Sequence, residues 1–207
     1  MAEVVLPRQA NVVVIGGGIV GAASAYFLAK RSVSVVLLER AEIGAEQSGR
    51  NWGFVRQQGR HPLEIPLAVE SNRIWQSAEA DLNADIEWTR GGNLAFALTT
   101  ERLAQYEAWL AEARDLIDAR IVTPDEIQDL IRGLRGDVLG GLYTPSDGHA
   151  DPVKATRAFA RAAEVAGATV VTGCAVDRIA TSDGTVTGVS SEGGEIAAST
   201  VVSAAGE

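Results

Sequence analysis

Three glycines and one acidic residue near the start of the chain have the spacing of a dinucleotide-binding site. Gly16, Gly18 and Gly21 fit the pattern G-x-G-x-x-G, and Glu39 follows roughly 20 residues further on. In such a site the first glycine allows a tight turn, the second lets the backbone approach a pyrophosphate, and the third lets a helix lie close to a sheet. An acid at this place accepts hydrogen bonds from an adenosine ribose and repels a 2′-phosphate, which disfavours NADP.

The elements that must position these residues occur in the required order. Residues 11–15 (NVVVI) and 34–38 (SVVLL) are apolar runs typical of parallel strands that are buried on both faces. Between them, residues 19–30 predict a helix whose N-terminal amides and dipole face the phosphates. Strand, glycines, helix, strand and acid fit one βαβ unit of ~30 residues. This order favours a dinucleotide site over an α/β turn that binds nothing.

A second polar segment follows the ribose-binding strand. Residues 48–51 (SGRN) offer a hydroxyl, a flexible backbone, a guanidinium and an amide, which together would line an extended pyrophosphate and a flavin. The planar fork of Arg50 suits a phosphate or a carboxylate. The other interpretation is a surface loop whose arginines are solvated, and the residues themselves leave both open. An NAD-linked dehydrogenase is the alternative that this segment disfavours.

Composition excludes several classes of partner. A net charge of −9 over 207 residues makes a nucleic-acid partner improbable, and no basic run favours a membrane surface. The apolar stretch near the N-terminus is interrupted by glycines and is too short to span a bilayer, and the first ten residues lack the layout of a secretion signal. Cys174 is the only cysteine, which excludes an intramolecular disulfide and a cysteine-based metal site, and no metal is expected. We expect a soluble, cytoplasmic protein.

The rest of the chain alternates predicted helices and strands. Helices are predicted over 63–82, 100–117, 123–131 and 152–166, and strands over 86–90, 93–98, 139–143, 169–171, 175–181, 185–189, 195–197 and 200–206. Gly91-Gly92 reads as the turn of a hairpin between the first two of these strands. Residues 1–85 and 150–207 are expected to form one discontinuous domain, and 86–149 a separate layer.

Several segments of the chain, taken in order, resemble those of a known family. Residues 12–40 (VVVIGGGIVGAASAYFLAKRSVSVVLLER) followed by 44–64 (GAEQSGRNWGFVRQQGRHPLE) resemble the FAD-dependent amino-acid oxidases and dehydrogenases, which include D-amino-acid, sarcosine and glycine oxidases. SGRNWGFVRQQGR is nearest to the opine and hydroxyproline dehydrogenase branch. Matching segments recur at 90–101, 147–170 and 201–206, so the resemblance runs over nearly the whole chain. It implies an α/β fold, with a Rossmann-like FAD-binding domain and a partial mixed or antiparallel substrate layer at 86–149.

The resemblance also implies which residues hold the cofactor. The residues expected to bind FAD are Gly16, Gly18, Ile19, Val20, Gly21, Glu39, Arg40, Ser48, Arg50, Asn51, Val176 and Gly206. The glycine turn takes the pyrophosphate, Glu39 the ribose, and residues 48–51 the pyrophosphate and flavin edge. Arg40 would flank the adenine and Val176 would contact it through its backbone. Family members with covalent flavin carry a histidine within 48–53, and since this chain has none there, we expect non-covalent FAD.

The implied reaction is oxidation of a C–N bond in an amino acid or secondary amine, with a hydride passing from the substrate carbon to flavin N5. Arg56 falls where sarcosine-oxidase-like members bind the substrate carboxylate, and no side-chain base is required. His61 and His149 read as hydrogen-bonding residues of loops. The C–N oxidation that the resemblance implies makes a small-molecule amino acid or amine the expected substrate.

One departure from the family is length. Members are substantially longer than 207 residues, and their second half supplies most of the wall over the flavin. We therefore expect a truncated chain with weak activity or none, which self-associates or needs a partner chain to complete the fold. The alternative is a non-catalytic, nucleotide-binding fragment or subunit.

Overall fold

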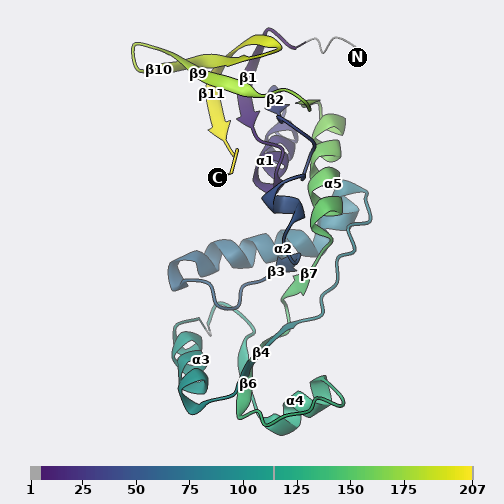
Figure 1. Ribbon diagram of the computed structural model, residues 1–207, viewed down its shortest axis with the longest axis vertical. Helices are drawn as coiled ribbons and strands as arrows, with labels where there is room; N and C mark the ends of the chain where they lie inside the picture. The colour runs from purple at the N-terminus through teal and green to yellow at the C-terminus, as the bar shows by residue number, and fades with distance from the viewer. Residues whose placement is uncertain (1–5, 114, 207) are drawn as a thin grey trace. The chain divides into compact units, whose positions relative to one another are not determined.

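The computed structural model describes residues 6–113 and 115–206 (Figure 1). The chain divides into two compact units. The first comprises Met1–Trp52, Leu82–Ile86 and Asp151–Glu207, and the second comprises Gly53–Asp81 and Glu87–Ala150. The domain boundaries expected from the sequence differ from this division over 53–81 and at residue 150, which they place with the first domain, and at residue 86, which they place with the second.

A six-stranded sheet is the centre of the first unit. Its order is β8-β2-β1-β11-β10-β9. The strands are β1 (Gln9–Ile15), β2 (Val35–Leu38), β8 (Thr169–Val171), β9 (Val176–Ser182), β10 (Thr185–Ser191) and β11 (Gly194–Ser203). The first four in spatial order are parallel, and β10 and β9 continue the sheet in antiparallel fashion. All four residues of β2 are buried, as its uninterrupted apolar run predicted.

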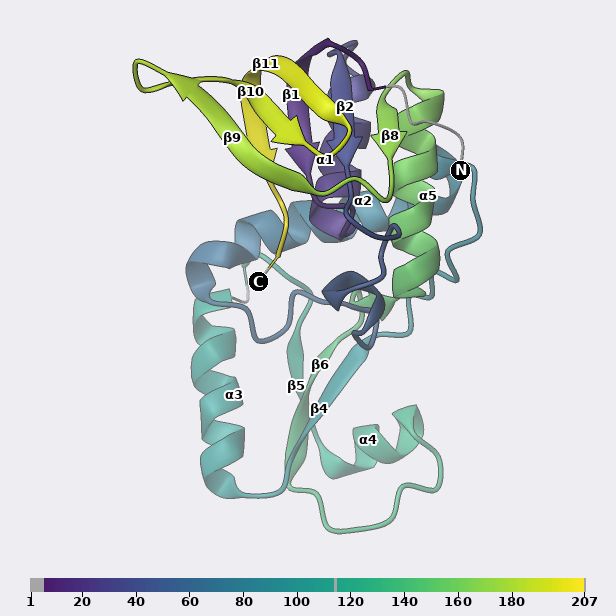
Figure 2. The same ribbon diagram turned by 45° about the horizontal axis from the view of Figure 1, so that its top comes forward.

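Two helices lie on one face of this sheet (Figure 2). The first is α1 (Ile19–Ala29), which connects β1 to β2, and it packs against α5 (Pro152–Val165). The rings of Tyr26 and Phe159 meet edge to face, with centroids 5.8 Å apart. The predicted cap of α5 is confirmed, because the Asp151 carboxylate accepts a 2.7 Å hydrogen bond from the Lys154 backbone N–H.

Residues 194–203 form one strand where the sequence predicted two. The segment contains no proline and no glycine after its first residue, so nothing interrupts the extended backbone. β11 pairs with antiparallel β10 along its first half and with parallel β1 from Ala197 onward. Ala197 is paired on both sides, with Gly188 and with Gln9, which makes β11 the joint between the two parts of the sheet.

The second unit contains a three-stranded antiparallel sheet in the order β4-β6-β5. Its strands are β4 (Asn93–Ala97), β5 (Arg120–Val122) and β6 (Gly140–Thr144), and a separate two-stranded ribbon pairs β3 (Phe54–Val55) with β7 (Gly148–His149). The helices are α2 (Ile65–Leu82), whose last residue belongs to the first unit, α3 (Thr100–Ala113) and α4 (Pro124–Leu130). Short 3₁₀ turns occur at η1 (Gln47–Gly49) in the first unit and η2 (Pro62–Glu64) in the second. Within the described residues, none of the helices combines the length and apolarity needed to cross a bilayer.

The predicted strand over 86–90 and its hairpin with 93–98 are wrong. Only Thr89 makes a β-bridge, to His149, and β4 pairs with β6 instead. Glu87 has a φ of 56°, a left-handed conformation that ends any extended run there.

The predicted start of α4 is confirmed. Thr123 and Glu126 form a capping box, and Pro124 is the first helical residue. The hydrogen bond from the Thr123 backbone N–H lowers the pKa of Glu126 below its ordinary value, with a smaller contribution from the Arg120 guanidinium.

Candidate functional site

A cleft opens at the carboxyl ends of the parallel strands in the first unit. Gly16 follows β1, Glu39 follows β2 and Ala204 follows β11. This edge of an open α/β sheet is where such folds bind ligands. The cleft is lined by Gly16, Gly18, Glu39, Arg40, Glu42, Gly44, Ala45, Glu46, Gln47, Ser48, Ala204, Ala205 and Gly206.

The three glycines occupy positions where a side chain would collide or protrude into the cleft. A Cβ on Gly16 would lie 2.4 Å from the Ala204 carbonyl oxygen, and Gly16 itself has a φ of 104°. A Cβ on Gly21 would lie 1.9 Å from the Gly16 carbonyl oxygen, so α1 packs directly onto the turn. Gly18 has an ordinary backbone conformation, and its Cβ would lie 2.9 Å from the Ser48 hydroxyl oxygen. The turn is therefore a backbone-lined cradle.

The N-terminus of α1 faces this cradle, with the Ser48 hydroxyl and the Glu39 carboxylate as acceptors beside it. Gly18 is the N-cap and offers no side-chain cap, and the first turn contains no acidic residue. The backbone N–H of Ile19 donates a 2.9 Å hydrogen bond to the Ser48 hydroxyl, and Val20 is 64% exposed. A helix end of this kind favours a phosphate, because its free N–H groups and its dipole both attract an anion.

Glu39 is buried and holds the glycine turn in place. One carboxylate oxygen accepts a 2.6 Å hydrogen bond from the Gly17 backbone N–H, and the other accepts a 2.7 Å bond from that of Ala41. A carboxylate has about four acceptor positions, so both oxygens can still accept from ribose hydroxyls. Glu39 thus has a structural task that its spacing did not reveal, in addition to the predicted one.

The other residues expected to bind a cofactor fall into two groups. Arg40, Ser48 and Gly206 line the cleft together with the glycines. Arg50, Asn51 and Val176 are not among the lining residues, and the first two are exposed.

Each residue of the second group has another contact in the first unit. The Arg50 guanidinium pairs with the Glu46 carboxylate at 3.0 Å. The Asn51 amide donates a 2.7 Å hydrogen bond to the Ser48 carbonyl. Val176 begins β9 and packs against the core beneath the sheet.

Sequence reasoning missed the part of the cleft made by residues 42–47. Gly44 has a φ of 75°, and its N–H donates a 3.0 Å hydrogen bond to the Gly17 carbonyl. A Cβ on Gly49 would lie 2.2 Å from the Gly44 carbonyl oxygen. The spacing of these two glycines is the signal that could have indicated a loop folded closely over the cradle.

Arg56 belongs to the second unit, where it lines a pocket of about 390 Å³. Its guanidinium donates a 3.3 Å hydrogen bond to the Gln58 carbonyl. The other lining residues are Phe54, Val55, Arg60, Glu64, Leu67, Ala68, Ser71 and Trp75.

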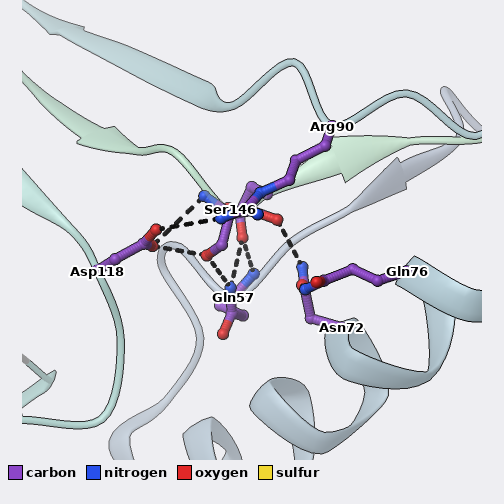
Figure 3. A network of polar contacts seen from close by, with 7 residues as sticks. Gln57, Asn72, Gln76, Arg90, Asp118 and Ser146 are labelled. Atoms are coloured by element: carbon purple, nitrogen blue, oxygen red, sulfur yellow. Dashed lines mark hydrogen bonds and ion pairs between the residues drawn. The ribbon is translucent and has the colours of Figure 1, made fainter.

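A polar network holds the segment that follows Arg56 (Figure 3). The Gln57 amide donates to the Ser146 hydroxyl at 2.8 Å, and that hydroxyl donates to the Asp118 carboxylate at 2.6 Å. Asn72 donates to the Ser146 carbonyl at 3.1 Å and accepts from Gln76 at 2.9 Å, which ties α2 to the same point.

Both histidines make hydrogen-bonding contacts, but only His61 lies outside the strands, because His149 belongs to β7. His61 accepts a 3.3 Å hydrogen bond from the Leu63 backbone N–H and caps η2, and His149 contacts the Thr89 carbonyl at 3.4 Å. Over residues 6–113 and 115–206, no group of three or more histidine, cysteine, aspartate or glutamate side chains could hold a metal ion.

Comparisons with known proteins identify the family and the fold. The family model described as "FAD dependent oxidoreductase" (DAO) matches residues 11–207. Human mitochondrial sarcosine dehydrogenase is 32% identical over 210 residues, covering 97% of this chain and 23% of that protein. The mouse mitochondrial pyruvate dehydrogenase phosphatase regulatory subunit is 28% identical over 208 residues, covering 99% of this chain and 24% of that protein.

A solved structure supports the fold. L-Amino acid deaminase from Proteus myxofaciens, in complex with anthranilate, superposes with a TM-score of 0.93 and 30% identity. The match covers 99% of this chain and 47% of that one, and it confirms the α/β fold class. The chain spans less than half the length of each of these relatives.

Proposed function

The chain belongs to the family of FAD-dependent oxidoreductases, and from that membership we propose that it oxidises the C–N bond of an amino acid or secondary amine. The observation that carries the proposal is the cleft at the ends of β1, β2 and β11. There, a glycine cradle, the N-terminus of α1 and a buried carboxylate meet within one unit. These are the features that the ADP part of a dinucleotide requires.

The chain's own residues divide the task of holding FAD. Gly16 and Gly18 let the backbone approach the pyrophosphate, and the first turn of α1 supplies a donor to it through the N–H of Val20, while the Ile19 N–H is held by the Ser48 hydroxyl. Glu39 fixes the turn and accepts from the ribose hydroxyls. Bound FAD supplies the acceptor for the hydride that leaves the substrate carbon beside nitrogen. We expect the cofactor to be non-covalent, because residues 48–53 include no histidine.

The substrate class is supported by what the relatives are named for. Sarcosine dehydrogenase and L-amino acid deaminase both carry names of amino-acid substrates. An amino acid or secondary amine needs an anchor for its carboxylate, and we propose Arg56 for this role because its planar guanidinium suits a carboxylate. A cytoplasmic location stays a prediction. Human sarcosine dehydrogenase, which this chain resembles, is named as a mitochondrial protein.

Absorbance spectroscopy of the purified protein tests this function. We expect a flavin spectrum after loading with FAD, and only slow or partial bleaching when an amino acid is added without oxygen, in line with the weak activity expected for a chain of this length. In Gly18→Ala the backbone conformation is allowed, but the new methyl would lie 2.9 Å from the Ser48 hydroxyl oxygen and crowd the backbone cradle, so FAD affinity should fall about tenfold or more. Gly91→Ala is the matched control, because its nearest neighbour atom is 4.0 Å from the added Cβ. Equal FAD affinity in both variants would contradict the assigned cleft.

A second candidate is a nucleotide-binding subunit without catalysis. It is favoured by the match to a protein named as a regulatory subunit. In that case FAD binds through the same cleft, and the flavin spectrum persists unchanged when amino acids are added without oxygen. The two candidates therefore differ in bleaching and agree in colour.

A further inference from the structure

Gln58 is a nearly fully buried glutamine of the second unit, two residues after Arg56, and it is 4% exposed. Its side-chain amide donates to the backbone carbonyls of Asn93 and Leu142 at 3.1 and 3.0 Å, and to the Thr144 hydroxyl at 3.1 Å. These acceptors lie on β4 and β6, which are neighbours in the three-stranded sheet. A buried amide costs free energy unless its donors are satisfied, so these three bonds fix the Gln58 side chain against the sheet.

The backbone of Gln58 makes two further contacts. Its N–H donates at 3.2 Å to the fully buried carboxylate of Asp147, which also accepts from the Gln57 N–H at 2.8 Å. Its carbonyl accepts a 3.3 Å hydrogen bond from the Arg56 guanidinium. Gln58 thus connects the sheet, the buried acid and the charged end of Arg56.

The turn that contains these residues, 56–60, is held at its far end as well. The Trp109 indole donates a 2.8 Å hydrogen bond to the Arg60 carbonyl. Between the two fixed points, Gly59 has a φ of 70°, a left-handed conformation that glycine adopts without strain. The acceptor that the Arg56 guanidinium uses therefore belongs to a backbone that is ordered before any ligand arrives.

Arg56 has no acidic partner that could orient it. Among the residues that the structure describes, no carboxylate lies within 4.0 Å of its guanidinium. Arg73 in the same unit differs, since its guanidinium donates to both carboxylate oxygens of Glu70, at 2.9 and 2.6 Å. An arginine side chain has many rotamers, so an unpaired guanidinium keeps one orientation only where another acceptor holds it.

We propose that Gln58 is a positioning residue for Arg56: its buried amide fixes the turn, and its carbonyl holds the guanidinium in one orientation at the pocket that Arg56 lines. Gln58 acts through Arg56 and not on the substrate, because a charged group that is already oriented binds a carboxylate at a lower entropic cost. The inference rests on the proposed function for the role of Arg56, whereas the orientation of the guanidinium is measurable without flavin or substrate.

NMR relaxation of the arginine Nε–H groups in the 207-residue protein tests this position. In the wild type we expect the Arg56 group, identified by its loss in Arg56→Lys, to have an order parameter above roughly 0.6, the value below which protein groups are flexible. In Gln58→Met, which keeps the length of the side chain and removes its donors, the order parameter should fall below roughly 0.6. The Arg73 group is the internal reference, because its pair with Glu70 does not involve the turn.

Two more variants make the test specific. Gln128→Met is the matched control, because the Gln128 amide donates at 3.0 Å to the Leu134 carbonyl, outside the turn, and its loss should leave Arg56 unchanged. Thr144→Val removes one of the three acceptors of Gln58 and keeps the shape of the side chain, so the Arg56 order parameter should take an intermediate value. Thr144→Val decides the question if Gln58→Met does not fold, as read by circular dichroism.

Flavin bleaching separates positioning from a general structural role. With sarcosine as the probe and no oxygen, Gln58→Met should raise the half-saturating concentration about tenfold or more and leave the limiting rate of bleaching within about twofold of the wild type. Such a split is expected from a lost orientation of the carboxylate anchor, because the anchor holds the substrate and takes no part in hydride transfer. A fall in the limiting rate with no change in the half-saturating concentration would contradict the positioning role.

The inference is overturned if the Arg56 group is flexible in the wild type, if it keeps its wild-type order in folded Gln58→Met, or if Arg73 loosens to the same extent. A protein that shows no bleaching, yet loses Arg56 order in Gln58→Met, retains the inference about position and loses the proposed function. A protein that bleaches with an Arg56 group indifferent to Gln58 does the opposite.

Discussion

At the scale of single residues, the most informative group is the Glu39 carboxylate. Its spacing after the glycines predicted a contact with a ribose, and the structure places it in the cleft. The structure adds that the same carboxylate accepts from the Gly17 and Ala41 backbone N–H groups. Local sequence could not reveal the bond to Gly17, because the two residues are 22 apart and only the packing of β2 beside β1 brings them together.

Glu39→Gln separates the two tasks of this residue. An amide can accept on one side only, so one of the two backbone N–H groups loses its acceptor, which costs about 1–3 kcal/mol of unfolding free energy. We expect a lower urea midpoint and weaker FAD binding. Glu195→Gln, an exposed acid of β11 in the same unit, should change neither.

If the Glu39→Gln protein has the urea midpoint and the FAD affinity of the wild type, the carboxylate neither supports the turn nor contacts the cofactor. A change in stability alone, without a change in FAD affinity, would assign it the structural task only.

At the scale of helices and strands, the predictions that the structure confirms rested on signals in the local sequence. The strand, helix and strand of the βαβ unit were predicted from apolar runs and glycines, and the caps of α4 and α5 from Thr123, Asp151 and the prolines after them. The prediction of a strand over 86–90 was wrong because Glu87 adopts a left-handed conformation that no composition rule indicates. The turn at 56–60 was equally hidden, since its main acceptor, Asp147, is 90 residues from Gln57.

Asp147→Asn tests whether that acceptor governs the arginine-bearing turn. Asp147 is fully buried, and among the described residues no cation lies within 4.0 Å of it, so neutral N–H groups alone stabilise its charge. An asparagine would present an NH₂ group toward one of the N–H donors, and the second unit should lose about 1–3 kcal/mol of stability. The amides of 57 and 58 should also exchange with solvent faster.

Ser77→Ala on α2 is a suitable control, because it removes an exposed hydrogen bond of the same unit outside the turn. An Asp147→Asn protein whose amides at 57 and 58 keep their wild-type protection would show that the turn is held by the Gln58 side chain and Trp109 without help from the carboxylate.

At the scale of the whole molecule, the chain devotes one unit to the dinucleotide cleft and the other to the arginine-lined pocket. The α/β class and the first unit's sheet could be predicted because their signals are local and repeated. The membership of 53–81 could not, because its contacts to 146–147 are made across some 90 residues of sequence. The spacing of apolar residues predicts the helix in this segment, but it does not indicate the unit to which that helix belongs.

Hydrogen exchange tests which of the two units holds FAD. At a concentration of FAD about 100 times its dissociation constant, the ligand adds roughly 2.7 kcal/mol to the stability of whatever it binds, equivalent to about 100-fold slower exchange through global opening. We expect that protection in β1, α1 and β2, and little change in the turn at 56–60 and the first turns of α2. Protection by FAD confined to the second unit would show that the glycine cradle does not hold the cofactor.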